Sequence, residues 1–94
     1  SMKYDIKFTG SFKKDIKRAK KQNKDLDKLI EVIEIIANGE KLEKKYKDHA
    51  LKGKYEGSRE CHVEPDWLLI YEICDDVLML MLCRVGSHSD LFKM

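Results

Sequence analysis

The stretch from Arg59 to Tyr71 reads RECHVEPDWLLIY and joins two strand-like runs through a Pro-Asp pair. In the first run Cys61 and Val63 alternate with polar residues, which is typical of a half-buried β-strand. Pro65 lacks a backbone N–H and bends the chain just before the most apolar run of the sequence. The pattern therefore predicts two strands on either side of this bend, Ser58–Glu64 and Trp67–Cys74.

Two more strands are expected outside this stretch. Val77–Val85 continues the strand pattern after Asp75-Asp76, a plausible two-residue hairpin turn. Near the start of the chain, Lys3–Phe8 alternates polar and apolar residues in the same way. The polar segment Lys41–Glu56 has no such period, and we expect it to be mostly loop.

Two helices are expected between the first strand and that loop. The first follows an N-cap at Thr9 or Ser11 and carries a short apolar stripe. The second follows Asn23 or Asp25, has a wide apolar face, and ends before Gly39, a residue suited to the position after a helix. The stripe consists of Phe12, Ile16 and Ala19, and the wide face of Leu26, Leu29, Ile30, Ile33, Ile36 and Ala37.

The expected order of elements is β-α-α-β-β-β, with the helices adjacent in sequence. Such an order is typical of the α+β class, so we expect an antiparallel sheet with two helices packed on one face. A chain of 94 residues can form one modest core. We expect one domain spanning residues 1–94.

The expected hairpin turn also sets the faces of the sheet. It places Trp67 opposite Arg84, and we expect His62 to share the open face with them. Cys61 and Val63 are expected to face the helices. The strand residues expected beside them on the helix side are Leu68, Ile70, Cys74, Val77, Met79, Met81 and Cys83.

Charge is unevenly distributed along the chain. Residues 1–56 contain sixteen Lys or Arg against ten Asp or Glu, and residues 57–94 contain three against seven. Between Lys13 and Lys24, seven basic residues accompany a single acid, Asp15. This run fits either a solvated helix face or a surface for a polyanion or an acidic partner. No apolar run is long enough to span a bilayer, and three cysteines without metal-ligand spacing favour reduced thiols in a cytosolic protein.

Three histidines lie where the predicted elements can converge: His49 before the strands, His62 on the open face, and His88 after the last strand. Nearby residues offer acid–base partners (Glu60, Asp66), phosphate-binding cations (Lys52, Arg59, Arg84) and rings that stack on bases (Trp67, Tyr71, Phe92). Imidazoles with cationic helpers suit general acid–base catalysis on a phosphodiester. RNA carries its own nucleophile, the 2′-OH, so such a site would cut RNA and not DNA.

The same residues allow other interpretations. Each histidine fits an ordinary surface or core position as well. His49, His62 and His88 form no close ligand pair in the sequence, which disfavours zinc, and we expect neither metal nor cofactor. Cys61 is expected to point away from His62, which disfavours catalysis by a cysteine nucleophile.

Two sequence blocks carry a resemblance to a known family. HVEPDW at His62–Trp67 matches a His-x-Glu-Pro-Asp-Trp run. The ending at Arg84–Phe92 matches Arg-x-Gly-[Ser/Thr]-His-x-x-Leu-Phe, with Ser89-Asp90 at the two variable positions, and DHALKG at Asp48–Gly53 is a weaker third match. With these motifs the chain, from Tyr4 to Phe92, resembles the YafQ branch of the RelE-like toxins of bacterial toxin–antitoxin systems.

The resemblance implies a RelE-like microbial RNase fold with a four-stranded antiparallel sheet and two helices. It implies a metal-independent, cytoplasmic endoribonuclease that enters the ribosomal A site, meets rRNA there, and cuts the translated mRNA. A cognate antitoxin would neutralise it, operator DNA would be reached only through the antitoxin complex, and no membrane would be involved. The implied catalytic residues are His49, His62, Asp66 and His88, and the implied substrate-binding residues are Trp67, Phe92, Arg59 and Arg84.

The resemblance also suggests roles. His88 would be the general acid, and either His49 or His62 the base. Asp66 would orient or tune a histidine, while Trp67 and Phe92 would position the nucleotide or support the pocket. Two alternatives keep the fold: a toxin that inhibits DNA gyrase without cutting RNA, and a domain that only binds antitoxin or rRNA. The gyrase alternative does not predict the combination of catalytic residues given above.

Overall fold

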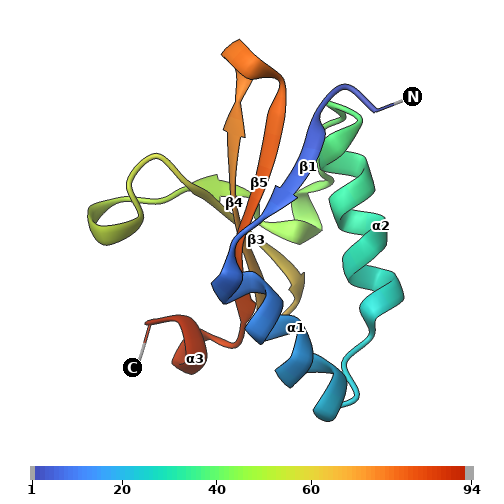
Figure 1. Cartoon of the computed structure of the whole chain (residues 1–94). Coiled ribbons are helices and arrows are strands. Elements are labelled where there is room, and N and C mark those ends of the chain that lie inside the picture. The colour runs from blue at the N-terminus through green and yellow to red at the C-terminus, as the bar shows by residue number, and fades with distance from the viewer. Residues whose placement is uncertain (1, 93–94) are drawn as a thin grey trace.

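A computed structural model of the chain describes residues 2–92. A mixed sheet of five strands, in the order β1-β5-β4-β3-β2, is covered on one face by α1 and α2 (Figure 1). The strands are β1 (Asp5–Phe8), β2 (His49–Ala50), β3 (Arg59–Glu64), β4 (Trp67–Cys74) and β5 (Met79–Gly86). The helices are α1 (Gly10–Lys21), α2 (Leu26–Ala37) and α3 (His88–Phe92), with 3₁₀ turns η1 (Lys44–Tyr46), η2 (Gly53–Tyr55) and η3 (Asp75–Val77).

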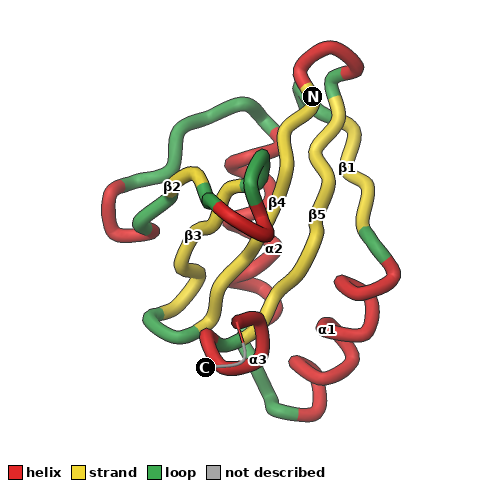
Figure 2. Tube along the Cα trace, turned by 90° about the vertical axis from the view of Figure 1, so that its left-hand side faces the viewer, coloured by secondary structure: helices red, strands yellow, loops and turns green. Residues whose placement is uncertain are grey.

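The α+β class is confirmed, but the strand count and one strand direction differ from expectation. β1 lies at an outer edge of the sheet and runs parallel to β5, from Asp5 beside Met79 to Phe8 beside Leu82 (Figure 2). No turn joins these two strands, because both helices and three strands intervene, so their relative direction is set by packing. The fifth strand, β2, is a two-residue segment at the opposite edge, within the region expected to be loop.

The helix ends follow the expected chemistry. The Thr9 hydroxyl accepts a hydrogen bond from the backbone N–H of Phe12 at 3.0 Å, and the Asp25 carboxylate accepts one from that of Lys28 at 3.1 Å. After α2, Gly39 has a φ of +78°, a left-handed conformation that glycine adopts without strain. Within residues 2–92, no helix is long and apolar enough to cross a membrane.

The main core lies between the helices and one face of the sheet. Cys61 and Val63 face this core, as expected. Trp67 also faces it and is only 2% exposed, so the prediction that Trp67 lies on the open face is wrong. The other strand residues in the core are Leu69, Tyr71, Leu80, Leu82 and Val85, whereas the expected set included Leu68 and Ile70.

A β-bulge near the Pro65 turn explains this error. Cys61 pairs with Leu69, but Glu64 pairs with Trp67, so β3 contains one more residue than its partner between these two pairs. A shift of one residue in register moves a strand's side chains to the other face. The sequence pattern alone did not reveal the bulge, and the faces of β4 and β5 were therefore assigned to the wrong sides.

The β4–β5 hairpin differs from expectation in a second way. Its turn is longer than the predicted pair, with η3 and a left-handed Leu78 (φ +48°) between the paired residues Cys74 and Met79. A second bulge, between Ile70 and Tyr71, places Arg84 opposite Ile70 and not opposite Trp67. Arg84 therefore lies on the face opposite the main core.

A buried carboxylate ties α1 to this bulged part of β5. Asp15, 3% exposed, accepts hydrogen bonds from Arg84 Nε at 2.7 Å, Arg84 Nη2 at 3.1 Å and the Val85 backbone N–H at 3.0 Å. Arg18 Nη2 donates to it as well, at 3.0 Å. The Asp15 carboxylate raises the pKa of the Arg84 guanidinium above its ordinary value. The single acid of the basic run is thus a structural residue, while its lysine neighbours along α1 line the molecular surface.

We predict that Asp15→Ala lowers the free energy of unfolding by about 2–3 kcal/mol, because it leaves the Val85 N–H and the Arg84 guanidinium without their acceptor. Asp5→Ala is the matched control, since the Asp5 side chain is exposed, and it should change the stability by less than about 0.5 kcal/mol. Urea denaturation followed by circular dichroism measures both. Equal stabilities for the two variants would contradict a structural role for Asp15.

Candidate active site

The four predicted catalytic residues come from different elements and form a connected group. His49 belongs to β2, His62 to β3, Asp66 to the turn before β4, and His88 to the first residue of α3. Hydrogen bonds join Asp66 to His88, and the rings of His62 and His88 lie 5.7 Å apart, centroid to centroid, at an interplanar angle of 62°. The antiparallel hairpins bring these elements together, as the sequence analysis expected.

Asp66 fixes both the backbone and the ring of His88. One carboxylate oxygen, Oδ1, accepts a hydrogen bond from the His88 backbone N–H at 2.9 Å and another from its Nδ1 at 2.7 Å. These two bonds, the backbone one first, lower the pKa of Asp66 below its ordinary value. The carboxylate therefore holds the imidazole in one orientation.

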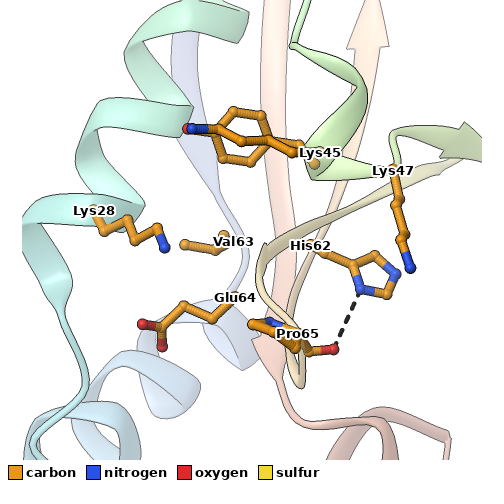
Figure 3. Close-up of a pocket in the computed structure, with 8 residues that line it drawn as sticks. Lys28, Lys45, Lys47, His62, Val63, Glu64 and Pro65 are labelled. Carbon is orange, nitrogen blue, oxygen red and sulfur yellow. Dashed lines mark hydrogen bonds between the residues drawn. The ribbon is translucent and has the colours of Figure 1, made fainter.

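His62 is held by the turn that follows its own strand. Its Nδ1 lies 3.3 Å from the backbone carbonyl oxygen of Pro65, and Figure 3 shows this contact as a dashed line. Pro65 therefore has two local effects: its own ring shapes the turn, and its carbonyl oxygen orients the His62 imidazole. The predicted break in the strand is part of the site.

Glu60 joins His62 to His49. His49 Nδ1 lies 2.7 Å from the carbonyl oxygen of Lys47, and its Nε2 lies 3.6 Å from Glu60 Oε1. The same Glu60 oxygen is 3.6 Å from His62 Nε2. Glu60 is only 5% exposed, so its carboxylate lies beneath the two rings and within ion-pair distance of both. The sequence analysis named Glu60 only as a partner for an imidazole and did not place it among the site residues.

All three imidazoles are held through the same ring atom. Nδ1 of His49, His62 and His88 faces the Lys47 carbonyl, the Pro65 carbonyl and the Asp66 carboxylate, respectively. These oxygens only accept hydrogen bonds, so a neutral ring carries its proton on Nδ1 and its lone pair on Nε2. Nε2 is thus the ring atom left for proton transfer, and in His49 and His62 it faces the Glu60 carboxylate at 3.6 Å.

The two predicted substrate-binding arginines are each paired with a carboxylate. Arg59 lies on the helix side of β3 and donates to Asp48 Oδ2 from Nε (3.2 Å) and Nη2 (2.8 Å). Asp48, which also accepts a hydrogen bond from the Tyr71 hydroxyl, raises the pKa of Arg59. Arg84 is held by Asp15, as described above. Arg59 thus lies on the face opposite His62, away from the histidine group.

Phe92 and Arg84 border a hollow of about 660 Å³ on the open face. The Phe92 ring packs edge-on against Tyr55 with 5.7 Å between centroids. Lys52 and Lys54 also line this hollow, beside Arg18, Asp90 and Leu91. Sequence reasoning missed Tyr55 and Lys54 because the polar segment around them has no regular period, although its basic and aromatic composition was visible.

The buried Trp67 supports the site from the core side and is not available to stack on a base. Its ring lies within the main core, with Lys24 Nζ 5.9 Å from its centroid. It directly follows Asp66, so its packing fixes the turn that carries this carboxylate. Of the two roles considered for Trp67, only support of the pocket fits its burial.

The cysteines do not take part in this group. Burial raises the pKa of the Cys61 thiol to about 12, which keeps it protonated at neutral pH. Among residues 2–92, no group of three or more His, Cys, Asp or Glu side chains has a geometry that could hold a metal ion.

This α+β fold is shared with a bacterial toxin of a toxin–antitoxin complex. Residues 4–93 match the family described as "Bacterial toxin of type II toxin-antitoxin system, YafQ". The chain belongs to this YafQ toxin family.

Proteins similar to this chain include toxins from two bacteria. The mRNA interferase toxin YafQ of Escherichia coli K12 is 43% identical over 89 residues, which cover 94% of this chain and 95% of that protein. In the crystal structure of the E. coli DinJ–YafQ toxin–antitoxin complex, the matched chain is 41% identical, with a TM-score of 0.87 and coverage of 97% and 99%. A metal-bound toxin from Helicobacter pylori is 44% identical, with a TM-score of 0.89 and coverage of 95% and 99%.

We predict that the Asp66 carboxyl group titrates below its ordinary pKa of 3.8 and that His88→Ala raises this value only part of the way back, because the backbone N–H at position 88 remains. The lowered value means that the Asp66–His88 contact stabilises the fold above pH 3.8 and that this stabilisation is lost as pH falls through the folded-state pKa. Carboxyl-detected NMR titration of both proteins measures this. An Asp66 pKa at or above 3.8 in the wild type would refute the contact.

Proposed function

We propose that this chain is a ribosome-dependent endoribonuclease that cuts translated mRNA in the A site, in which the 2′-OH attacks the adjacent phosphate. The observation that carries the proposal is the convergence of His49, His62 and His88, each held at Nδ1, with Nε2 of His49 and His62 facing the Glu60 carboxylate. The name of the E. coli relative, an mRNA interferase toxin, supports the same reaction. On this proposal the protein acts in the cytoplasm, where translation occurs.

In the first part of the reaction, Nε2 of His49 or His62 takes the proton of the 2′-OH. Both atoms lie 3.6 Å from the Glu60 carboxylate, which would stabilise the imidazolium that forms on either ring. The resulting oxyanion attacks phosphorus, and a 2′,3′-cyclic phosphate forms as the bond to the 5′-oxygen breaks. The geometry of Glu60 is equally favourable for both candidates for the base.

His88 is the candidate for the general acid. Its Nδ1 is held by the Asp66 carboxylate, and its Nε2 would donate a proton to the leaving 5′-oxygen. The His88 ring neighbours that of His62, so acid and base can lie on either side of one phosphate. An in-line displacement needs the acid and the base on opposite sides of the phosphate, since the nucleophile and the leaving group lie on opposite sides of phosphorus.

Cations of the open face would hold the substrate. Lys52, Lys54 and Arg84 line one hollow with Tyr55 and Phe92, a combination suited to a phosphate flanked by a stacked base. The lysines of α1 would attract rRNA over a longer range. The same charge would attract an acidic segment of a cognate antitoxin, and operator DNA would then be met only through that complex. The DinJ–YafQ complex of the E. coli relative supports an antitoxin partner.

Primer extension on a reporter mRNA in a translating extract tests the proposal. Wild type should produce cuts in frame with codons, and His88→Ala should lower the cleavage rate about 10²–10⁴-fold, the usual contribution of a general acid or base. The same loss is expected for whichever of His62→Ala and His49→Ala removes the base, and a smaller loss for the other. Asp76→Ala, at an exposed position in the η3 turn, is the control and should cleave normally. Intact mRNA with wild type would overturn the proposal and direct attention to gyrase inhibition or rRNA binding.

A further inference from the structure

A second hollow adjoins His62 on the side of β3 that faces α2 and η1. It has a volume of about 240 Å³ and is lined by Lys28, Lys45, Tyr46, Lys47, His62, Val63, Glu64 and Pro65. Figure 3 shows the Lys47 side chain running down beside the His62 imidazole and the Lys28 side chain extending from α2 toward Val63 and Glu64. The hollow therefore shares His62 with the proposed catalytic group.

The charge of this hollow is strongly positive. Three lysines from two separate elements line it, against one acid, Glu64. Within residues 2–92, none of these lysines is among the ion pairs with N···O of 4.0 Å or less. Lys45 Nζ instead lies 5.2 Å from the centroid of the Tyr46 ring. The hollow thus gathers positive charge that the fold itself does not neutralise.

The placement of Lys28 is unfavourable for the helix that carries it. Its backbone N–H donates to the N-cap Asp25, so Lys28 lies in the first turn of α2. The positive end of a helix dipole disfavours a cation at this position. A negatively charged group bound in the hollow would compensate for both the dipole and the lysine.

Lys47 links the hollow directly to His49. Its backbone is in the left-handed region, with φ of +50°, which is uncommon for a residue other than glycine, asparagine or aspartate. In this conformation its N–H donates to the Lys44 carbonyl, and its own carbonyl accepts from His49 Nδ1 at 2.7 Å. Lys47 thus orients the His49 ring through its backbone carbonyl and places its side-chain charge beside the His62 ring.

We propose that Lys28, Lys45 and Lys47 bind a backbone phosphate of the RNA substrate next to the phosphate that is cut. This inference rests on the proposed function and deepens it. The hollow is smaller than the ~300–1,000 Å³ of sites that enclose whole small molecules, so a single charged group is the suitable ligand. Lysines bind phosphates as point charges, and a contact to the backbone positions the strand without selecting a base.

The test uses ribosomes programmed with a message in which one phosphate near the A-site codon at a time is replaced by an uncharged methylphosphonate. The variants are Lys28→Gln, Lys45→Gln and Lys47→Asn, singly and together; asparagine tolerates the left-handed backbone at position 47. The matched control is the triple variant Lys3→Gln, Lys7→Gln, Lys41→Gln, which removes the same charge at exposed positions outside both this hollow and α1.

Each single variant should raise KM several-fold with kcat nearly unchanged. The triple variant should lower the dependence of log affinity on log salt concentration by about 0.7 for each phosphate that the protein no longer neutralises. One methylphosphonate position adjacent to the cut should weaken wild-type binding and leave the triple variant unaffected, which a purely structural role of the lysines does not predict. The unfolding temperature of Lys28→Gln should be unchanged or raised.

Equal effects of the hollow variants and the control triple variant would overturn the proposal. Loss of antitoxin neutralisation with intact cleavage would overturn it in favour of an acidic protein segment in the hollow. Binding to ribosomes carrying an uncleavable 2′-O-methyl message separates phosphate binding from catalysis. If wild type cuts nothing but still shows the lysine-dependent methylphosphonate effect, the proposed reaction fails and the phosphate site stands.

Discussion

The structure depends on a buried carboxylate in an otherwise basic helix. Asp15 accepts hydrogen bonds from both Arg84 and the backbone of Val85, and so joins α1 to β5 where the β4–β5 register shifts. His88 lies three positions after Val85 in the chain. The position of His88, the proposed acid, thus depends on α1, a helix that contributes none of the proposed catalytic residues. The single acid of α1, Asp15, is buried, and its lysines lie on the surface.

The three histidines of the candidate site are held in the same way. Each imidazole is held at Nδ1 by a hydrogen-bond acceptor from a neighbouring turn. A carboxylate also lies near each ring: Glu60 beside His49 and His62, and Asp66 beside His88. Two of the three acceptors are backbone carbonyls, from Lys47 and Pro65, so they depend on loop conformation and not on side-chain identity. The turns around the sheet therefore set the orientation of the three imidazoles.

The sequence allowed α1, α2, the strands β1, β3, β4 and β5, and the four catalytic candidates to be predicted, because caps, periodicity and the HVEPDW and RVGSHSDLF motifs are local signals. The short helix α3 was not predicted. The side of the sheet on which each β4 and β5 residue lies could not be predicted. A bulge at the Pro65 turn exchanges the two faces of these strands, and no residue type near Val63 or Trp67 indicates the bulge in the sequence. The parallel pairing of β1 with β5 and the short β2 also escaped prediction, since both depend on contacts between distant segments. Glu60 was recognised as a partner, but its place between two rings required the structure.

The central claim is that these imidazoles activate a 2′-OH. The most direct measurement replaces the nucleotide on the 5′ side of the cut with its 2′-deoxy analogue, in a message presented on the ribosome, and characterises the ends of the product from the unmodified message. The account predicts no cleavage of the deoxy message, and a 2′,3′-cyclic phosphate with a 5′-hydroxyl from the unmodified one. Cleavage of the deoxy message, or a product with a 5′-phosphate, would contradict it.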